Sequence, residues 1–393
     1  MKKSRKSNYS LVILCVLLFD FINFYLRVNE IIGEPLGMNL KRISYIFLFL
    51  NFIYTFAVYL IKNVGISKIT LFNLTFMVFM LVMYFRRGNA LELSDIMNLT
   101  SWYIIPFLFY YYGFPKSKRA LNTIMAVFVF MFIFMYYRFG VLSDVRNAGV
   151  TNAIYFLIMS LLFVMFMENR VLKIVFYVSI TVLTILSLKI VPLAMLFSTL
   201  IIGFVFQRNN SRGSLLKRFV ASGVALLIVG VLFLVVSYIA GIDILGNITM
   251  DIDNEGNGRF DIWRNIINIF SRAPVNEKLF GLGFEKSEEL IGMAAHSDFL
   301  EVLFSFGFVG LAFFIISFFL VAKKIVIRAW KRGSRYLGIA LAAVCQMLII
   351  FAFSNSFFVS NYLLIALSMV GFLLNHYDSR PVHYISSHHH DEY

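Results

Sequence analysis

Residues 299–322 read FLEVLFSFGFVGLAFFIISFFLVA and contain one charged side chain, Glu301. A helix needs about 20 apolar residues to cross a bilayer, and this run is long enough. The whole chain has a similar composition: of its 393 residues 60% are hydrophobic and only 14% are charged. Soluble domains carry about 25% charged residues. The composition therefore excludes a soluble globular protein and predicts an all-α, polytopic integral membrane protein.

The apolar runs predict about 12 transmembrane helices. They cover residues 10–26, 43–61, 69–85, 96–114, 121–137, 152–167, 172–188, 190–206, 219–239, 299–322, 337–354 and 360–375. An even number of crossings places both termini on one side of the membrane. Cytoplasmic loops are enriched in Lys and Arg, and most of the 35 such residues fall on the side of the termini. We therefore expect both termini to be cytoplasmic.

The chain reads as a single membrane domain over residues 1–393, with one long extracytoplasmic loop at 240–298 that is rich in acidic residues. The net charge of +14 does not indicate a nucleic-acid partner, because the basic residues lie between apolar runs. Cys15 and Cys345 both lie inside apolar runs, so neither a disulfide framework nor a thiolate metal site is expected. Function should be sought in the long loop.

The loop contains a predicted amphipathic helix at 258–270. Its apolar residues recur at helical spacing: Trp263, Ile266, Ile267 and Phe270. Such a helix lies on a membrane surface or caps a bundle, and Trp263 suits an interfacial position. Arg259 precedes the apolar stripe and is not needed for it.

Asp251, Asp253 and Glu255 alternate ahead of Gly256, as at the start of a calcium loop. The twelfth position is Ile262, where an EF-hand needs a bidentate Glu, so a complete EF-hand is excluded. A weak divalent site and a solvated acidic turn both remain open, the turn being the simpler interpretation.

Two further residues have competing structural and functional interpretations. His296 lies just before the predicted helix of the run at 299–322, and at the start of that helix Asp298 and Glu301 fit a capping box. A helix N-terminus disfavours a protonated imidazole, so His296 is either a structural residue or a neutral general base. Lys189 separates two apolar runs in a tight external turn. It is either a snorkelling lysine that marks a helix end or the partner of an anion.

The C-terminal half resembles the bacterial O-antigen and capsule polymerases of the Wzy type and the related O-antigen ligases. The resemblance rests on an ordered set of elements: Ser187 and Lys189 in one external turn, Gly258-Arg259 with Trp263, Pro274, Gly281-Leu282-Gly283, His296, and Gly307-Phe308-Val309-Gly310. Two positions depart from the family pattern. Leu188 separates Ser187 from Lys189, and Ser297 replaces the usual Asn after the histidine. Two Arg-to-Gly spacings typical of the polymerases, Arg138 to Gly149 and Arg272 to Gly283, favour polymerase over ligase.

The resemblance implies a membrane glycosyltransferase of the bacterial cytoplasmic (inner) membrane. It would transfer a glycan from undecaprenyl pyrophosphate onto the next lipid-linked repeat unit of an O-antigen or capsule, at the outer face. We predict His296, Arg259 and Lys189 as catalytic. His296 would take the proton of the acceptor hydroxyl, and the two cations would neutralise the pyrophosphate leaving group. Direct attack would invert the anomeric configuration. We expect no cofactor and no metal.

Other residues on the external side are predicted to bind substrate: Arg138, Arg146, Arg264, Arg272 and Trp263. The alternative for each arginine is a contact with lipid headgroups. Expected partners are the lipid-linked oligosaccharide, membrane lipid, a chain-length regulator protein and a flippase. Two rival functions remain open: a ligase that passes finished glycan to lipid A core or protein, and a flippase or other transporter. A transporter would need more charged residues inside the spans, and Asp20, near the start of the chain, is the one clear case.

Overall fold

A computed structural model describes residues 2–28, 31–62, 68–86, 93–113, 118–138, 154–187, 189–206, 259–284, 286–354 and 364–378. Over these ranges the secondary structure is helical, with no strand, so the predicted all-α class is confirmed. The helices that precede the long loop are α1 (Lys2–Val28), α2 (Glu34–Lys62), α3 (Lys68–Arg86), α4 (Leu93–Tyr112), α5 (Lys118–Tyr136), α7 (Ile154–Met159), α8 (Leu161–Phe166), α9 (Arg170–Leu186) and α10 (Ile190–Phe206). The remainder are α13 (Arg259–Arg272), α14 (Val275–Phe280), α15 (Lys286–Ile291), α16 (Asp298–Arg332), α17 (Ser334–Phe353) and α18 (Leu364–Asp378).

Eleven of the predicted spans coincide with helices of the described regions, and the span at 219–239 lies outside them. By length and apolarity, four helices of the described regions suffice to cross a membrane: Glu34–Ile61, Ile69–Arg86, Asp298–Lys331 and Ser334–Phe353. Five further helices are apolar but shorter. The membrane class is thus supported, and the count of 12 crossings stays a prediction.

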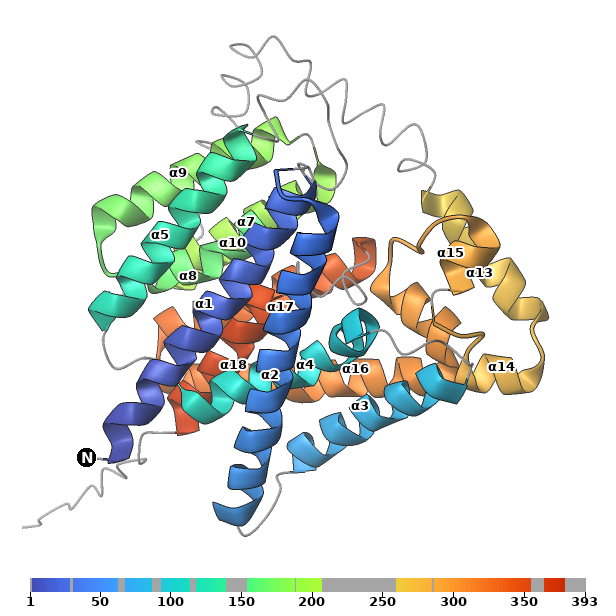
Figure 1. Cartoon of the computed structure of the whole chain (residues 1–393). Coiled ribbons are helices and arrows are strands. Elements are labelled where there is room, and N and C mark those ends of the chain that lie inside the picture. Colours follow the sequence, from blue (N-terminus) through green and yellow to red (C-terminus); the bar gives the residue numbers. More distant parts are fainter. Residues whose placement is uncertain are drawn as a thin grey trace, which may run out of the picture.

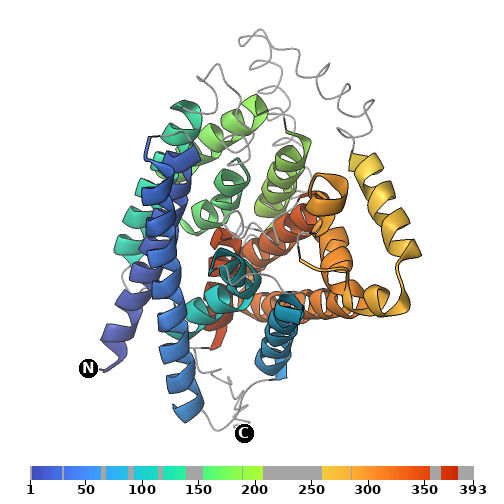
Figure 2. The same cartoon turned by 45° about the vertical axis from the view of Figure 1, so that its right-hand side comes forward.

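The bundle is assembled from long-range helix pairs (Figures 1 and 2). The most extensive contacts join α4 to α18, α10 to α17, and α16 to α17. Gly371 on α18 lies so close to α4 that an added Cβ would be 2.5 Å from the carbonyl oxygen of Pro106. Polar contacts also join the helices: the buried Gln346 amide on α17 donates to the Thr199 hydroxyl of α10 at 2.7 Å. Small residues and interhelical hydrogen bonds of this kind are common between membrane helices.

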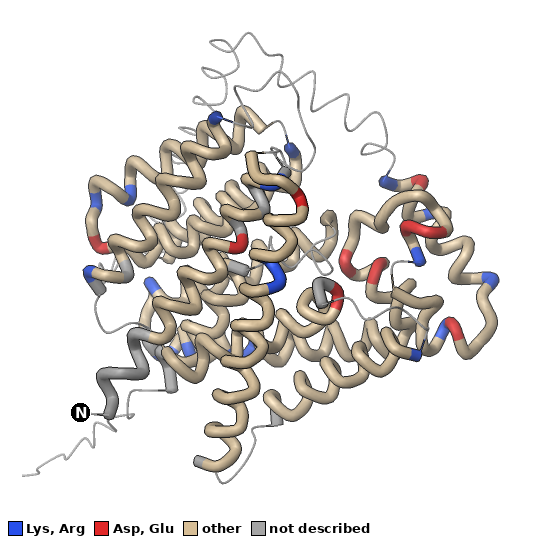
Figure 3. The backbone as a smooth tube through the Cα atoms, viewed as in Figure 1, with Lys and Arg blue, Asp and Glu red and all other residues tan. Residues whose placement is uncertain are grey.

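The helix α16 is kinked at Gly307, whose backbone angles are φ 68° and ψ −168°. The predicted span of 299–322 is therefore two helical segments rather than one straight rod. Helices α13, α14 and α15 pack beside the N-terminal segment of α16 (Figure 1). Acidic and basic positions lie close together along these short helices, whereas charged positions are sparse along the rest of the bundle (Figure 3).

The amphipathic helix at 258–270 forms as α13, but its buried face differs from the predicted one. Ile262, Ile266 and Phe270 are buried, whereas Ile267 is 53% exposed. The buried residues pack against Ala295 and Phe304 rather than lying on a flat surface. This rotation of the stripe turns the ring of Trp263 toward the loop that precedes α16.

Candidate functional site

Lys189, Arg259 and His296 lie in one electrostatic cluster although they are far apart in the chain. The positive charges of Arg259 and Lys189 both act on His296, and the charge of Arg259 acts on Lys189. The structure thus brings together the three residues predicted as catalytic. Their chemical roles stay a prediction.

Lys189 is held in a short turn between α9 and α10. The Ser187 hydroxyl donates to the carbonyl oxygen of Thr184 at 2.6 Å, which closes the end of α9. The backbone N–H of Lys189 donates to the Ser187 hydroxyl oxygen at 3.4 Å. The turn is as tight as the sequence predicted, and it leaves the Lys189 side chain half-buried.

Arg259 is the first residue of α13 and is anchored to the bundle through Tyr155. The Arg259 guanidinium and the Ser354 hydroxyl both form hydrogen bonds with the hydroxyl of Tyr155, a buried residue in the first turn of α7. Ser354 ends α17. A guanidinium fixed in this way is preorganised to meet an anion, because its side chain is already ordered.

His296 has φ 51° and is, among the residues that the structure describes, the one non-glycine residue with a positive φ. Such backbone geometry is uncommon, costs about 1–3 kcal/mol and is concentrated at functional sites. The preceding residue, Ala295, is held at both of its backbone polar groups. Trp263 Nε1 donates to the carbonyl oxygen of Ala295 at 2.8 Å, and the N–H of Ala295 donates to Glu301 Oε2 at 2.9 Å. We call these two hydrogen bonds the Ala295 clamp.

Glu301 is buried and is itself oriented by two serines. Its Oε1 accepts hydrogen bonds from Ser287 at 2.6 Å and from Ser305 at 3.5 Å. The predicted capping box of Asp298 and Glu301 is therefore wrong. Ser297 is the N-cap of α16, and Glu301 reaches back past it to Ala295. The reason is that the extended backbone of Ser297 starts the helix at Asp298, so that Glu301 lies one position beyond that of a capping-box glutamate.

The two glycine motifs contact each other beneath this loop. The N–H of Leu282 donates to the carbonyl oxygen of Phe304 at 2.8 Å. A Cβ added at Gly281 would lie 2.1 Å from the Ser305 carbonyl oxygen, and one at Gly307 would lie 2.4 Å from the Leu279 backbone. Glycine is required at both positions because the two backbones approach so closely. This contact holds the segment around Gly281 against the kink of α16.

Burial and mutual repulsion shift the pKa values of the cluster. Burial, and then the charge of Arg259, lowers the pKa of Lys189 from 10.5 to about 8. Burial, then Arg259 and Lys189, lower the pKa of His296 below its usual 6.5. At neutral pH the imidazole is therefore neutral, and Lys189 is mostly protonated. The neutral imidazole can accept a proton, and the two cations beside it can stabilise negative charge on a substrate.

The other predicted site residues are distributed differently. Arg138 lies two residues beyond the end of α5, and Arg264 and Arg272 lie on α13; all three are exposed. Arg264 pairs with Asp261 at 3.0 Å. Arg146 falls outside the described residues, as do Gly258 and the acidic turn with Asp251, Asp253 and Glu255. Trp263 contacts the His296 loop through the Ala295 clamp, which the sequence did not suggest.

Tyr155 and Glu301 were missed by the sequence analysis. Tyr155 is one of 20 tyrosines, and no local pattern distinguishes it. Glu301 carried a signal, since it is the one charged residue in the run at 299–322, but its spacing from Asp298 pointed to a local helix cap. Among the residues described, no group of three or more His, Cys, Asp or Glu side chains is arranged to hold a metal ion.

These features define a helical membrane protein with a basic, histidine-containing site at the ends of several helices. The family model for O-antigen ligase matches residues 180–315, a range that includes Lys189, Arg259 and His296. The match confirms the resemblance to the superfamily of O-antigen ligases and polymerases found from the sequence. No curated protein matches the chain.

Proposed function

We propose that the protein is an O-antigen or capsule polymerase, a membrane glycosyltransferase. It would transfer a glycan from an undecaprenyl-pyrophosphate carrier onto the next lipid-linked repeat unit at the outer face of the bacterial cytoplasmic membrane. The observation that carries the proposal is the convergence of Arg259, Lys189 and His296. The superfamily match supports a glycan-transferring enzyme; the choice of polymerase rests on the two Arg-to-Gly spacings in the sequence.

In the proposed reaction a hydroxyl of the acceptor sugar attacks the anomeric carbon of the donor glycan. His296 accepts the hydroxyl proton as the new C–O bond forms. The bond from the anomeric carbon to the pyrophosphate oxygen breaks, and the lipid pyrophosphate leaves with its electron pair. Arg259 and Lys189 stabilise the negative charge on that leaving group. A single displacement of this kind inverts the anomeric configuration.

The second candidate is an O-antigen ligase, which would pass finished glycan to lipid A core or to a protein. It is favoured by the matching family model, whose description is O-antigen ligase. The proposed chemistry at the donor end is the same for both enzymes. The acceptor alone distinguishes them.

The test is glycan profiling by gel in cells that carry the wild type, a deletion, His296→Ala or Arg259→Ala, with the membrane level of each variant measured. Lys278→Ala, which removes a cation of α14 outside the proposed site, is the matched control. A polymerase predicts a single repeat unit on the normal acceptor for the deletion and both site variants, and wild-type chains for the control. Long chains that stay on the carrier lipid would identify a ligase. Normal glycan in the deletion strain would refute both functions.

A further inference from the structure

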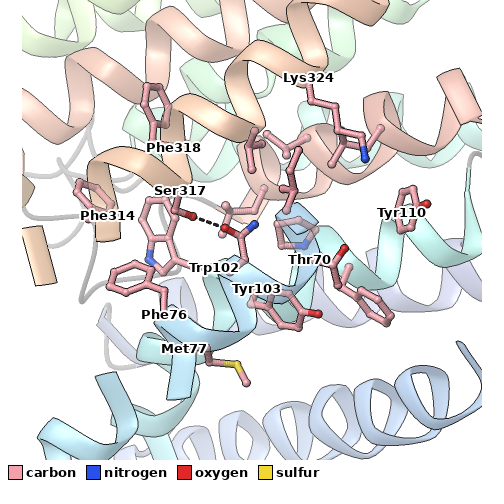
Figure 4. A pocket seen from close by; sticks show the side chains of 18 of the residues that line it. Thr70, Phe76, Met77, Trp102, Tyr103, Tyr110, Phe314, Ser317, Phe318 and Lys324 are labelled. Atoms are coloured by element: carbon pink, nitrogen blue, oxygen red, sulfur yellow. Dashed lines mark hydrogen bonds between the residues drawn. The ribbon is translucent and has the colours of Figure 1, made fainter. Parts of the chain in front are cut away.

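A cavity of about 110 Å³ lies among α3, α4, α16, α17 and α18. Phe76, Trp102 and Phe314 lie at one end of it, and Thr70, Tyr110 and Lys324 at the other (Figure 4). A wall between these ends carries a hydrogen bond from the Ser317 hydroxyl to Asn73 Oδ1. The cavity is therefore amphipathic along its length, with an aromatic end and an end that bears a cation.

The cationic end is remote from the His296 cluster. Lys324 follows the kink at Gly307 by 17 residues on α16, which at 1.5 Å per residue corresponds to roughly 25 Å of continuous helix. The hydrocarbon core of a bilayer is about 30 Å thick. The predicted topology places Lys324 on the cytoplasmic side of this crossing and His296 on the external side, and the glycan chemistry proposed above makes no use of Lys324.

The walls favour an alkyl chain as the occupant. Most of the lining side chains are aliphatic, aromatic or methionine, and several of them, among them Met77 and Trp102, are only half-buried. Apolar walls that face an empty space lose dispersion contacts, which an alkyl chain would restore. At this depth in a membrane the available apolar material is lipid.

Charge selects the class of lipid. The Lys324 ammonium lies over the Tyr110 ring, 5.9 Å from its centroid. Arg328, one turn further along α16, donates to the carbonyl oxygen of Leu374 at 3.4 Å. Basic groups between helices at a membrane boundary attract anionic headgroups. The cavity thus pairs an apolar slot with a cationic mouth, which is the complement of a phospholipid with net negative charge.

We propose that this cavity binds one acyl chain of an anionic phospholipid from the leaflet opposite to His296. The phosphate lies at Lys324, and the chain extends past Ser317 toward Trp102. The proposal is independent of the polymerase assignment, because it concerns the other end of the bundle.

The three tryptophans of the chain provide a direct test. The double variant Trp263→Phe/Trp330→Phe leaves Trp102, which lines the cavity, as the one tryptophan. Bromine atoms on an acyl chain quench tryptophan fluorescence on contact. The purified variant is placed in phosphatidylcholine vesicles in which a fixed minor fraction carries brominated chains, on either phosphatidylglycerol or phosphatidylcholine. We expect about fivefold stronger apparent binding of the brominated phosphatidylglycerol, as for one lysine near an anionic headgroup.

Two lysines of α16 give a matched pair of variants. Lys324→Gln should reduce the preference for phosphatidylglycerol to about one, whereas Lys323→Gln should retain it, because Lys323 is exposed and does not line the cavity. Val321→Phe, which fills the cavity, should weaken quenching by both lipids while the helical circular dichroism is kept. Equal quenching by the two brominated lipids, or a preference that survives Lys324→Gln, would overturn the proposal. Relief of quenching by unlabelled polyprenyl phosphate but not by phosphatidylglycerol would identify an isoprenoid occupant and would also refute it.

Discussion

Replacing Trp263 by Phe should lower the rate of glycan transfer with little effect on substrate affinity. The change removes the Nε1 donor of the Ala295 clamp and keeps an aromatic ring between Phe260 and Phe353, whose centroids lie 5.4 and 6.4 Å from that of Trp263. Arg259 and Lys189 are untouched, so the cations that would bind pyrophosphate remain.

The magnitude follows from the strain that the clamp offsets. The left-handed backbone of His296 costs about 1–3 kcal/mol. The hydrogen bond from Trp263 contributes roughly 1 kcal/mol, and the bond to the Glu301 carboxylate contributes about 1.5–3 kcal/mol if the carboxylate is charged. With Trp263 removed, the remaining bond and the strain are nearly balanced, so a large share of molecules should leave the active conformation. Since 1.4 kcal/mol corresponds to a factor of ten, the loss of roughly 1 kcal/mol should lower kcat by up to about fivefold.

The assay is transfer in proteoliposomes with a purified lipid-linked repeat unit, from which kcat and KM are obtained separately. Trp330→Phe is the control, because Trp330 is 74% exposed near the far end of α16. An unchanged kcat together with a raised KM would show that Trp263 binds the sugar and would refute the clamp. Full activity of the variant would refute both roles.

Glu301→Gln tests the same clamp from its other side. A Gln side chain keeps the shape but has one acceptor oxygen in place of two, so it cannot accept from both Ala295 and Ser287 as Glu301 does, and kcat should again fall. Because both substitutions act on the backbone of one residue, Ala295, the double variant with Trp263→Phe should lose less than the product of the two single effects. Independent, multiplicative losses would mean that the two residues do not share a function.

Two further predictions concern the charges and the glycine contact. Transfer requires protonated Lys189 and neutral His296, so the plot of kcat/KM against pH should be bell-shaped, with an acid limb below pH 6.5 and an alkaline limb near pH 8. The variant Arg259→Gln loses a cation that repels both groups, so both limbs should move to higher pH. Limbs that do not move would contradict the proposed coupling. In thermal unfolding, Gly307→Ala should destabilise the protein by roughly 1–3 kcal/mol more than Gly292→Ala. Both glycines have a positive φ, but of the two only Gly307 faces backbone atoms within 4 Å of an added Cβ. Equal shifts in the two variants would refute the steric argument.

The helices were largely predictable because hydropathy is a local property of the sequence. The bend in α16 was not, since the run at 299–322 is apolar on both sides of Gly307 and its periodicity does not change there. The glycine pair at 307 and 310 was recognised as a motif. Its physical role depends on the approach of Gly281 from another segment, which no window around Gly307 contains.

The candidate site divides in the same way. Lys189, Arg259 and His296 were singled out because each residue type is costly or unexplained where it stands, and the family resemblance then selected the catalytic interpretation over the structural one. Tyr155 and Glu301 were not, because their importance lies in partners brought by other helices, and a local rule assigned Glu301 to a helix cap.

The placement of the site follows from the pairing of antiparallel helices. Tyr155 starts α7 and Ser187 ends α9, while Asp298 starts α16 and Ser354 ends α17, so each hairpin begins and ends at the same end of the bundle. The side of the membrane that these helix ends face stays a prediction from the alternation of spans. Which hairpins become neighbours depends on packing between α10, α16 and α17. This packing brings the helix ends together into one site, in which Arg259 contacts Tyr155. In that site burial, and then the charge of Arg259, lowers the pKa values of Lys189 and His296.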